Sequence, residues 1–363
     1  MLNVEEQYMN MALQLARQGE GWTSPNPMVG AVLVNEDGVV ATGYHRYPGG
    51  THAEVEALNQ AGDKAKGSTL YVNLEPCCHF GKTSPCTEAL IRAGVAEVVI
   101  ALVDPNPRVA GKGMERLQEA GINVRTGILE KEARRLNEAF IKFITTGLPF
   151  VTLKTATTLD GKVATCRGDT RWITGEASRE EVHRLRHRVD GIVTGIHTVL
   201  QDDPSLNTRI EGGRDAARII VDTRARLPLD ARVVKLSSEA PTLLAAGENT
   251  SLENKKMLER KGVEVITLPQ EGGMVSLSSL LEELGKRNMI SLMVESGGTL
   301  NYSFLEKGLV DKIYAFMAPV ICGGEQAPTS FEGKGATLLR EAWRLKEVET
   351  EPFGEDLLVT GYL

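Results

Sequence analysis

The chain has 363 residues, a length that suggests two or three domains at about 150 residues per domain. Its residues are 42% hydrophobic and 25% charged, which is typical of a globular protein and excludes collagen-like, low-complexity and disordered classes. The formal net charge is −7 and both halves are slightly acidic, which disfavours a nucleic-acid partner because phosphate backbones bind basic surfaces.

The first half of the chain alternates helix-like and strand-like segments. Tyr8, Met11 and Leu15 recur at helical spacing. In chain order we expect a helix at 4–18, strands at 29–34 and 39–44, a helix at 52–60, a strand at 69–74, a helix at 87–93, a strand at 95–103, a helix ending at 120, a strand at 122–126 and a helix at 129–145. This alternation predicts a layered α/β domain over residues 1–146.

Thr145–Pro149 contains the breaker residues of a domain junction. After it, we expect strands at 150–157, 190–194, 218–222, 242–246, 263–268 and 290–295, with helices at 178–188, 252–261 and 276–286. Strand-like segments at 312–318, 343–349 and 357–363 suggest an antiparallel finish to a mostly parallel sheet. A second α/β domain is therefore predicted at 149–363.

The five cysteines are an odd number, which disfavours a disulfide framework. No apolar run approaches the roughly 18 residues that cross a bilayer, and the acidic start of the chain does not resemble a secretion signal. We therefore expect a cytoplasmic protein with no membrane partner. Three of the cysteines, Cys77, Cys78 and Cys86, fall close together and suggest a metal site.

His52-Ala53-Glu54, followed by Pro76-Cys77 and then Cys86, supplies the residue types of a catalytic zinc site. Three protein ligands leave a fourth position for water, whose pKa the ion lowers towards neutrality. Glu54 is suited to move protons from that water to a leaving amine. It does not share a helix face with His52, since residues two apart diverge. A closed structural site, with Cys78 or His79 as fourth ligand, is the alternative, and it would leave Glu54 without a role.

These residues resemble the zinc nucleobase deaminases, whose pattern is H-x-E followed by P-C-x-x-C. Here eight residues separate Cys77 from Cys86, and this longer insert is similar to the deaminases of riboflavin biosynthesis. The resemblance implies that His52, Cys77 and Cys86 bind Zn²⁺ and that Glu54 is the catalytic acid and base.

Further residues of the first domain fit a substrate pocket around the metal. The amide of Asn26 can both donate to and accept from a pyrimidine edge, and His45 follows a strand. Asn26 could equally belong to an ordinary turn between two prolines. The resemblance implies that Lys82 and Asn106 hold the phosphate or ribose, although Lys82 by itself would more often be a solvated surface residue.

In the second domain, Gly297-Gly298 lies between a strand and a helix, where free N–H groups favour phosphate. The segment is not a G-x-G-x-x-G fingerprint, and a turn without a ligand is the alternative. Arg186 and Arg209 can each grip a phosphate through two hydrogen bonds, although the arginines near Arg186 could be only a charged helix face. Trp172 could stack on a planar ring or lie in the core.

The second half resembles the reductase domain of the bifunctional riboflavin-biosynthesis enzymes, which is related in fold to dihydrofolate reductase. The segments that match are 154–162, 171–174, 202–209, 221–223 and 295–298. The resemblance implies NADPH contacts at Ala156, Trp172, Thr198, Asp202, Thr223, Gly297, Gly298, Thr299, Leu300, Asn301, Tyr302 and Ser303. It implies contacts with the phosphoribosyl substrate at Lys154, Thr170, Arg186, Leu206, Arg209 and Glu295.

Together, these observations predict an α/β protein with a cytidine-deaminase-like layered domain followed by a dihydrofolate-reductase-like domain. The resemblance implies deamination of 2,5-diamino-6-ribosylamino-4(3H)-pyrimidinone 5′-phosphate and then NADPH-dependent reduction of the ribosyl group to ribityl. Asp202, Lys154 and Glu295 are the candidate proton donors for the reduction. We expect small phosphoribosyl-pyrimidine substrates and a homo-oligomer.

Two alternatives remain at this level. One is a zinc deaminase of another nucleobase or a nucleic acid whose second domain only binds nucleotide. The other is a zinc-stabilised nucleotide-binding protein without turnover.

Overall fold

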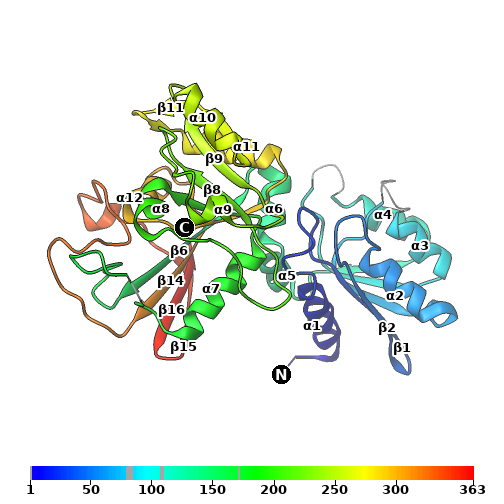
Figure 1. The fold of residues 1–363 in the computed structure, drawn as a ribbon. Helices are drawn as coiled ribbons and strands as arrows, with labels where there is room; N and C mark the ends of the chain where they lie inside the picture. The colour runs from blue at the N-terminus through cyan, green and yellow to red at the C-terminus, as the bar shows by residue number, and fades with distance from the viewer. Residues whose placement is uncertain (1, 79–84, 107–109, 171) are drawn as a thin grey trace. The chain divides into compact units, whose positions relative to one another are not determined.

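The structure, a computed structural model, describes residues 2–78, 85–106, 110–170 and 172–363 (Figure 1). The chain divides into two compact units, Met1–Gly147 and Leu148–Leu363. Within the described residues, every helix is too short or too polar to cross a membrane.

The first unit is built on a five-stranded sheet in the order β2-β1-β3-β4-β5. Its strands are β1 (Gly30–Asn35), β2 (Gly38–Tyr44), β3 (Thr69–Leu74), β4 (Glu97–Leu102) and β5 (Asn123–Thr126). Strand β1 pairs antiparallel with β2 and β3, whereas β3, β4 and β5 run parallel. The predicted hairpin and the predicted strands of this half are confirmed, with ends that shift by one or two residues.

Helices cover both faces of this sheet, which gives three layers (Figure 1). Because successive residues of a strand point to opposite faces, Ala31 and Leu33 of β1 belong to one core and Val32 to the other. The first core lies beneath α2 (Ala53–Ala61), α3 (Cys86–Ala93) and α4 (Lys112–Glu119). The second lies beneath α1 (Val4–Arg17) and α5 (Glu130–Leu136), with a short η1 (Gly62–Ala65) after α2.

The single helix predicted at 129–145 is wrong, since the structure divides it into α5 and α6 (Glu138–Thr146). The two helices meet at Asn137, whose φ of −109° and ψ of 23° are not helical. The buried Asn137 amide instead accepts from the N–H of Met28 over 2.8 Å and donates to the carbonyl of Met28 over 2.9 Å. A contact with a segment far away in the chain therefore breaks the helix.

The second unit contains a nine-stranded sheet in the order β10-β9-β8-β7-β13-β6-β14-β16-β15. Its strands are β6 (Phe150–Thr158), β7 (Gly191–Gly195), β8 (Ala217–Val221), β9 (Thr242–Gly247), β10 (Val263–Leu268), β13 (Ser291–Val294), β14 (Lys312–Ala318), β15 (Lys346–Phe353) and β16 (Asp356–Tyr362), and β11 (Gln270–Glu271) and β12 (Met274–Val275) form a separate pair. The strands from β10 to β14 are parallel, and β16 and β15 are antiparallel, which confirms the predicted antiparallel finish.

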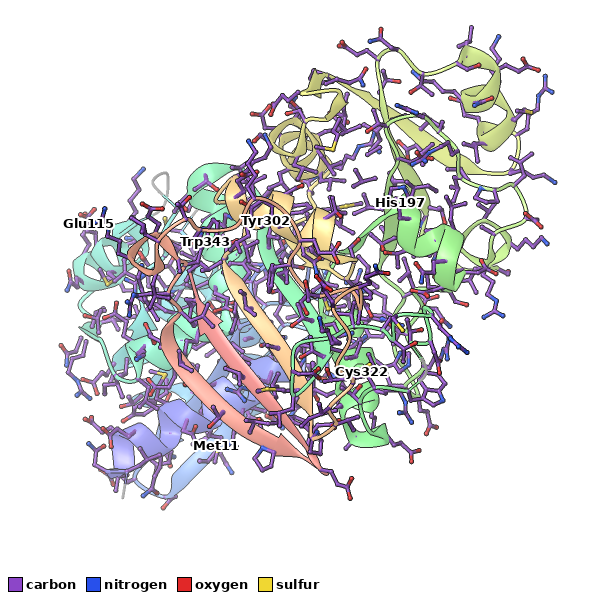
Figure 2. The ribbon with its side chains drawn as sticks, turned by 90° about the vertical axis from the view of Figure 1, so that its left-hand side faces the viewer. Met11, Glu115, His197, Tyr302, Cys322 and Trp343 are labelled. Atoms are coloured by element: carbon purple, nitrogen blue, oxygen red, sulfur yellow. The ribbon has the colours of Figure 1, made fainter. Side chains whose placement is uncertain are left out.

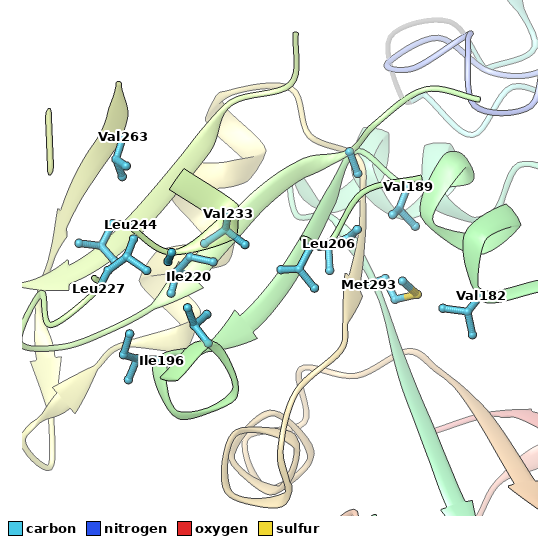
Figure 3. Close-up of a cluster of buried hydrophobic side chains, with 14 of the residues drawn as sticks. Val182, Val189, Ile196, Leu206, Ile220, Leu227, Val233, Leu244, Val263 and Met293 are labelled. Carbon is cyan, nitrogen blue, oxygen red and sulfur yellow. The ribbon is translucent and has the colours of Figure 1, made fainter. Parts of the chain in front are cut away.

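Two apolar cores lie on the two faces of this sheet. One contains side chains from α7 (Glu176–Arg188), α8 (Ile196–Asp202), α9 (Arg232–Lys235) and α10 (Leu252–Glu259). Figure 3 shows Ile220, Leu244 and Met293 of the strands in this core beside Val182 and Ile196 of the helices. The other core lies beneath α11 (Leu277–Lys286) and α12 (Gly298–Glu306).

One predicted strand begins later than expected. The sequence predicts an extended segment at 343–349, but β15 begins at Lys346, after a short η2 (Leu339–Glu341). Trp343 instead packs edge-on against Tyr302 of α12, with ring centroids 6.1 Å apart (Figure 2). Helices α8 and α9, with seven and four residues, had no expected counterpart, because segments this short show little periodicity.

Candidate functional site

Three side chains that the sequence singled out as metal ligands lie together in the first unit. Nδ1 of His52 is 3.1 Å from Sγ of Cys86 and 3.6 Å from Sγ of Cys77, and the three ligand atoms all lie within 4.8 Å of one another. Across a tetrahedral Zn²⁺ with ordinary bond lengths, a nitrogen and a sulfur ligand are about 3.5 Å apart. The donor set therefore fits zinc in both atom type and spacing.

The ends of two helices bring these ligands together. His52 is the N-cap residue of α2 and Cys86 is the first residue of α3. Helix α2 packs closely on β2 at Gly43, where an added Cβ would lie 2.3 Å from the carbonyl oxygen of Ala53. Because helix N-termini favour negative charge, the start of α3 favours a thiolate beside it.

Cys77 follows β3 and is held by the start of α3. The Cys86 N–H donates to the Cys77 sulfur over 3.4 Å, and the N–H of Thr87 donates to the Cys77 carbonyl over 3.2 Å. The Cys86 thiol and then the His52 ring lower the pKa of Cys77 to about 4, so that this residue carries the thiolate when the two cysteines share one proton. Cys78 is not part of the three-residue ligand group, and burial raises the pKa of its thiol.

Glu54, in the first turn of α2, is only 3% exposed. Its Oε2 has no hydrogen-bond partner among the described residues. Burial, and then the negative charge of Cys77, raise the pKa of Glu54 to about 7. A buried carboxyl with an unpartnered oxygen and a pKa near neutrality, next to the ligand group, has the properties of a general acid and base.

Asn26 and His45 lie next to each other and next to the ligand group. Nδ2 of Asn26 is 3.0 Å from Nε2 of His45, and the rings of His45 and His52 are 5.5 Å apart. The backbone of Met28, two residues after Asn26, is held by the buried amides of Asn73 and Asn137. Asn26 lies in a turn, where its N–H donates to the carbonyl of Thr23 over 2.8 Å, and its amide is directed at a buried histidine beside the ligand group.

Of the two predicted phosphate or ribose contacts, the structure describes only Asn106. Lys82 lies outside the described residues. Asn106 is half-buried in the segment that follows β4, where its N–H donates to Oδ1 of Asp104 over 2.8 Å and its carbonyl accepts from the Ala110 N–H over 2.9 Å.

In the second unit, three charged side chains from three elements form one cluster. Glu295, after β13, accepts from Nζ of Lys154 over 3.2 Å. Arg186 of α7 binds both carboxylate oxygens of Glu295, with Nη2 at 2.9 Å and Nε at 3.1 Å. The three side chains are 12–17% exposed. Burial would raise the pKa of Glu295, but the charges of Arg186 and Lys154 outweigh it and hold this pKa well below its usual range.

Arg186 differs from the other arginines of α7. The Arg184 side chain is 43% exposed and pairs with Glu180 and Glu181. The Arg186 side chain is 12% exposed and also donates from Nη1 to the carbonyl of Asn207 over 3.0 Å. The alternative of a purely charged face is therefore wrong for Arg186. With three of its donors engaged in these contacts, Arg186 orients Glu295 and the chain at Asn207.

Residues near Asn207 place the other predicted substrate contacts. Leu206 is buried and has a φ of 51°, and the exposed Arg209 donates from Nε to the side-chain oxygen of Asn207 over 3.2 Å. Thr170 is half-buried in the irregular segment before α7.

The Gly-Gly segment begins α12, with Gly297 as its N-cap. Oγ of Ser296 accepts from the N–H of Gly195 over 2.9 Å and lies 3.5 Å from Oγ1 of Thr198. The exposed part of the predicted 297–303 segment is Gly297 and Thr299, whereas Asn301 and Tyr302 are buried. The start of α12 is thus accessible to a ligand, and Asn301 and Tyr302 anchor the helix in the unit.

The other predicted cofactor contacts are spread over three elements. Ala156 lies in β6 and Asp202 ends α8. Thr223 follows β8, where its Oγ1 accepts from the N–H of Val275 over 3.2 Å. Trp172 is 70% exposed with the guanidinium of Arg179 4.7 Å from its ring centre, so the alternative that places Trp172 in the core is wrong.

Four supporting side chains were not singled out as functional from the sequence. Asn73 and Asn137 hold the Met28 segment, as described above. Glu75 accepts backbone N–H groups and has its signal in the Glu75-Pro76-Cys77 motif. His183 lies one turn before Arg186 on α7, a spacing that predicts a shared face, and burial followed by the charges of Arg186 and Arg209 lowers the pKa of His183.

Two protein families match this chain. The cytidine and deoxycytidylate deaminase zinc-binding region matches residues 2–102, and the RibD C-terminal domain matches residues 149–359. The riboflavin biosynthesis protein RibD of Aquifex aeolicus is 44% identical over 359 residues, which cover 98% of each chain. The RibD of Escherichia coli is 41% identical over 334 residues, which cover 88% of this chain and 89% of the relative.

Solved structures show the same similarity over the whole length. Acinetobacter baumannii RibD has a TM-score of 0.88 at 38% identity, and covers 99% of this chain and 98% of its own. A diaminohydroxyphosphoribosylaminopyrimidine deaminase/5-amino-6-(5-phosphoribosylamino)uracil reductase from Thermotoga maritima has a TM-score of 0.86 at 36% identity, with the same coverage. These similarities confirm the predicted fold class, a cytidine-deaminase-like domain followed by a dihydrofolate-reductase-like domain.

Proposed function

This chain belongs to the RibD family of riboflavin biosynthesis proteins, a family of zinc deaminases fused to reductases, and from that premise we infer which residues carry each reaction. We assign deamination to residues 1–146 and reduction to residues 149–363. The substrates we assign are 2,5-diamino-6-ribosylamino-4(3H)-pyrimidinone 5′-phosphate and then its deaminated product. The observation that carries the first assignment is the convergence of His52, Cys77 and Cys86 beside the buried carboxyl of Glu54.

For the deaminase, His52, Cys77 and Cys86 would hold Zn²⁺, which would supply a Lewis acid that makes a bound water a nucleophile near neutral pH. Glu54 takes a proton from the attacking water and delivers a proton to the departing amino group. The oxygen of the water becomes a carbonyl oxygen on the ring, and the 2-amino group leaves as ammonia. A pKa near 7 suits this role, because the same carboxyl must accept and then donate a proton at neutral pH.

Asn26 and His45 orient the pyrimidine ring in this proposal. The Asn26 amide nitrogen is directed at His45, which leaves its carbonyl oxygen to accept from a ring N–H or amino group. Asn106, together with Lys82 outside the described residues, would hold the ribose or phosphate.

For the reductase, NADPH would supply the hydride, and the chain would supply binding and orientation. We assign the cofactor to Ala156, Trp172, Thr198, Asp202, Thr223 and the 297–303 segment, because the accessible start of α12 suits a phosphate. The exposed guanidinium of Arg209 would bind the substrate phosphate, with Thr170 and Leu206 beside it.

The charged cluster distinguishes two of the three candidate proton donors for opening the sugar ring, Glu295 and Lys154. Glu295 stays ionised because Arg186 and Lys154 hold its pKa low, so it is a poor acid near neutral pH. Lys154 has N–H donors at its Nζ, which lies 3.2 Å from the carboxylate that orients it. We therefore propose Lys154 as the donor, with Glu295 and Arg186 as positioning residues.

The alternative of a nucleic-acid deaminase with a non-catalytic second domain is not favoured, since the RibD C-terminal domain accounts for that half. A protein without turnover is equally disfavoured by the buried acid beside the ligand group. The five free cysteines agree with a reducing compartment such as the cytoplasm, and a homo-oligomer stays a prediction.

The experiment that tests the function uses the full chain loaded with zinc. The diaminopyrimidine phosphate should release ammonia, whereas cytidine and RNA should not. NADPH should be oxidised with the deaminated nucleotide, or with the diamino nucleotide only after ammonia appears, and NADH should be the poorer reductant. Ammonia release from cytidine or RNA but not from the diaminopyrimidine phosphate would overturn the substrate assignment.

A further inference from the structure

Glu75 directly follows β3, lies two residues before Cys77, and is 4% exposed. Its carboxylate accepts four backbone hydrogen bonds. Oε2 accepts from the N–H groups of Asp104 over 3.0 Å and Gly111 over 3.1 Å, and Oε1 accepts from Gly113 over 2.8 Å and Met114 over 3.2 Å. Among the described residues, this buried carboxylate therefore accepts main-chain N–H groups from another part of the unit.

These four donors come from both ends of the chain between β4 and α4. Asp104 lies just after β4, whereas Gly111, Gly113 and Met114 belong to the start of α4. Asn106 lies between these ends, and its N–H is bound to the side chain of Asp104. The Glu75 carboxylate thus binds the chain two residues before Asn106 and again at the start of α4.

The start of α4 also touches Pro76, the residue that precedes the metal ligand Cys77. At Gly113, an added Cβ would lie 2.3 Å from the carbonyl oxygen of Pro76 and 2.9 Å from Oε1 of Glu75. Only a residue without a side chain fits this approach without movement. The Glu75–Pro76 backbone and the start of α4 are therefore in direct contact.

Simple stabilisation of α4 would not require this arrangement. The N-cap of α4 is Gly111, which has no side chain to accept from the first N–H groups. A serine or aspartate at that position would supply the cap locally. Here the acceptor comes instead from two residues before Cys77, which ties the helix start to the metal site.

We propose that Glu75 is a positioning residue of the deaminase, which holds Asn106 at a fixed distance from the metal ligand Cys77. The inference rests on the proposed deaminase function. As a consequence of this positioning, the ribose phosphate of the substrate is bound where the reacting pyrimidine carbon lies at the metal site. Loss of Glu75 weakens substrate binding more than it slows the chemical step, because the proton-transfer group and the ligands remain in place.

The test compares Glu75→Gln with wild type in zinc content, ammonia-release kinetics and amide hydrogen exchange. The glutamine places an NH₂ group against two of the N–H donors. We expect one zinc per chain, a KM for the diaminopyrimidine phosphate raised by about tenfold or more, and a kcat within about threefold of wild type. The amides of residues 104, 111, 113 and 114 should exchange faster.

Asp190→Asn is the matched control in the second unit, since the Asp190 carboxylate likewise accepts backbone N–H groups, from Ile290 over 2.9 Å and Ser291 over 3.1 Å. It should lower the Tm and leave the deaminase KM unchanged. Gly113→Ala, which pushes on the same contact from α4, should reproduce the KM increase of Glu75→Gln and serves if that variant does not fold.

A lower Tm in Glu75→Gln with unchanged KM and kcat per zinc would overturn the proposal, as would loss of zinc in parallel with activity. A wild-type enzyme that releases no ammonia from the diaminopyrimidine phosphate would instead refute the proposed function. The hydrogen-exchange comparison would still report whether Glu75 protects the amides of residues 104, 111, 113 and 114.

Discussion

His45 and Asn26 form a hydrogen bond whose direction follows from the contact at the other nitrogen of the histidine ring. Nδ1 of His45 lies 3.1 Å from the carbonyl oxygen of Thr51, which can only accept, so Nδ1 carries the proton. Nε2 therefore accepts from the Asn26 amide over 3.0 Å. Burial lowers the pKa of His45, in agreement with a neutral ring.

Replacement of Asn26 by Asp should reverse this arrangement. The carboxylate cannot donate, so Nε2 must take a proton to pair with it, and the pKa of His45 should rise. We expect an upward shift in the NMR titration of His45 and a higher KM for ammonia release. Asn26→Ala, which offers no partner, should keep the titration low, and an unchanged titration in Asn26→Asp would contradict the assigned tautomer.

The Glu54→Gln variant should lose ammonia release by about 10²–10⁴-fold, because the amide cannot transfer protons. Zinc content should stay the same, since Glu54 is not a ligand in the proposed site. Glu56→Gln on the same helix is the matched control, because Glu56 pairs with Arg46 at the surface and should be dispensable. Near-wild-type turnover of Glu54→Gln, measured per zinc, would exclude the proposed proton transfer.

The cysteines should differ in their effect on metal content. Cys77→Ser and Cys86→Ser should each lose most of the zinc, whereas Cys78→Ser should keep it, because Cys78 lies outside the ligand group. Atomic absorption on the purified variants measures this directly. Removal of zinc by a chelator should abolish ammonia release and spare NADPH oxidation with the deaminated nucleotide, and equal loss of both activities would argue against separate sites.

Glu295 should make the free energy of unfolding depend on pH in the acid range. The pKa of Glu295 is depressed in the folded protein and ordinary, near 4.5, in the unfolded chain. The unfolded chain therefore takes up the proton first as pH falls. The stabilisation is fully present above about pH 5 and is lost progressively below it. Denaturant titrations from pH 7 to pH 3 should show a steeper loss in wild type than in Glu295→Gln.

At pH 7 the same Glu295→Gln variant should be less stable by about 1–3 kcal/mol, a range reduced for partial exposure of the cluster, because Lys154 and Arg186 lose their counter-charge. Its NADPH oxidation should fall and its ammonia release should stay unchanged. The reverse pattern, reduced deamination with intact reduction, would refute the assignment of the two activities to the two units.

Much of the fold could be predicted from local patterns. The strands at 263–268 and 312–318 have the predicted ends, and the helix predicted at 4–18 is Val4–Arg17. These elements follow from side-chain periodicity within a few turns or pleats. The break at Asn137 could not be predicted in this way, because its cause is a hydrogen bond to Met28, 109 residues away.

The residues of the candidate metal group could be identified from the sequence because His52, Glu54, Cys77 and Cys86 form a recognisable motif. The sequence by itself determined the α/β fold class, the family and the residue types of the candidate metal group. Only the tertiary structure decided that Arg186 is engaged by Glu295, that Trp172 lies on the surface, and that Glu75 joins α4 to the metal segment. The physical reason is that the periodicity of a helix or strand depends on residues close together in the chain. Contacts between distant elements depend instead on which side chains the packing of sheets and helices brings together.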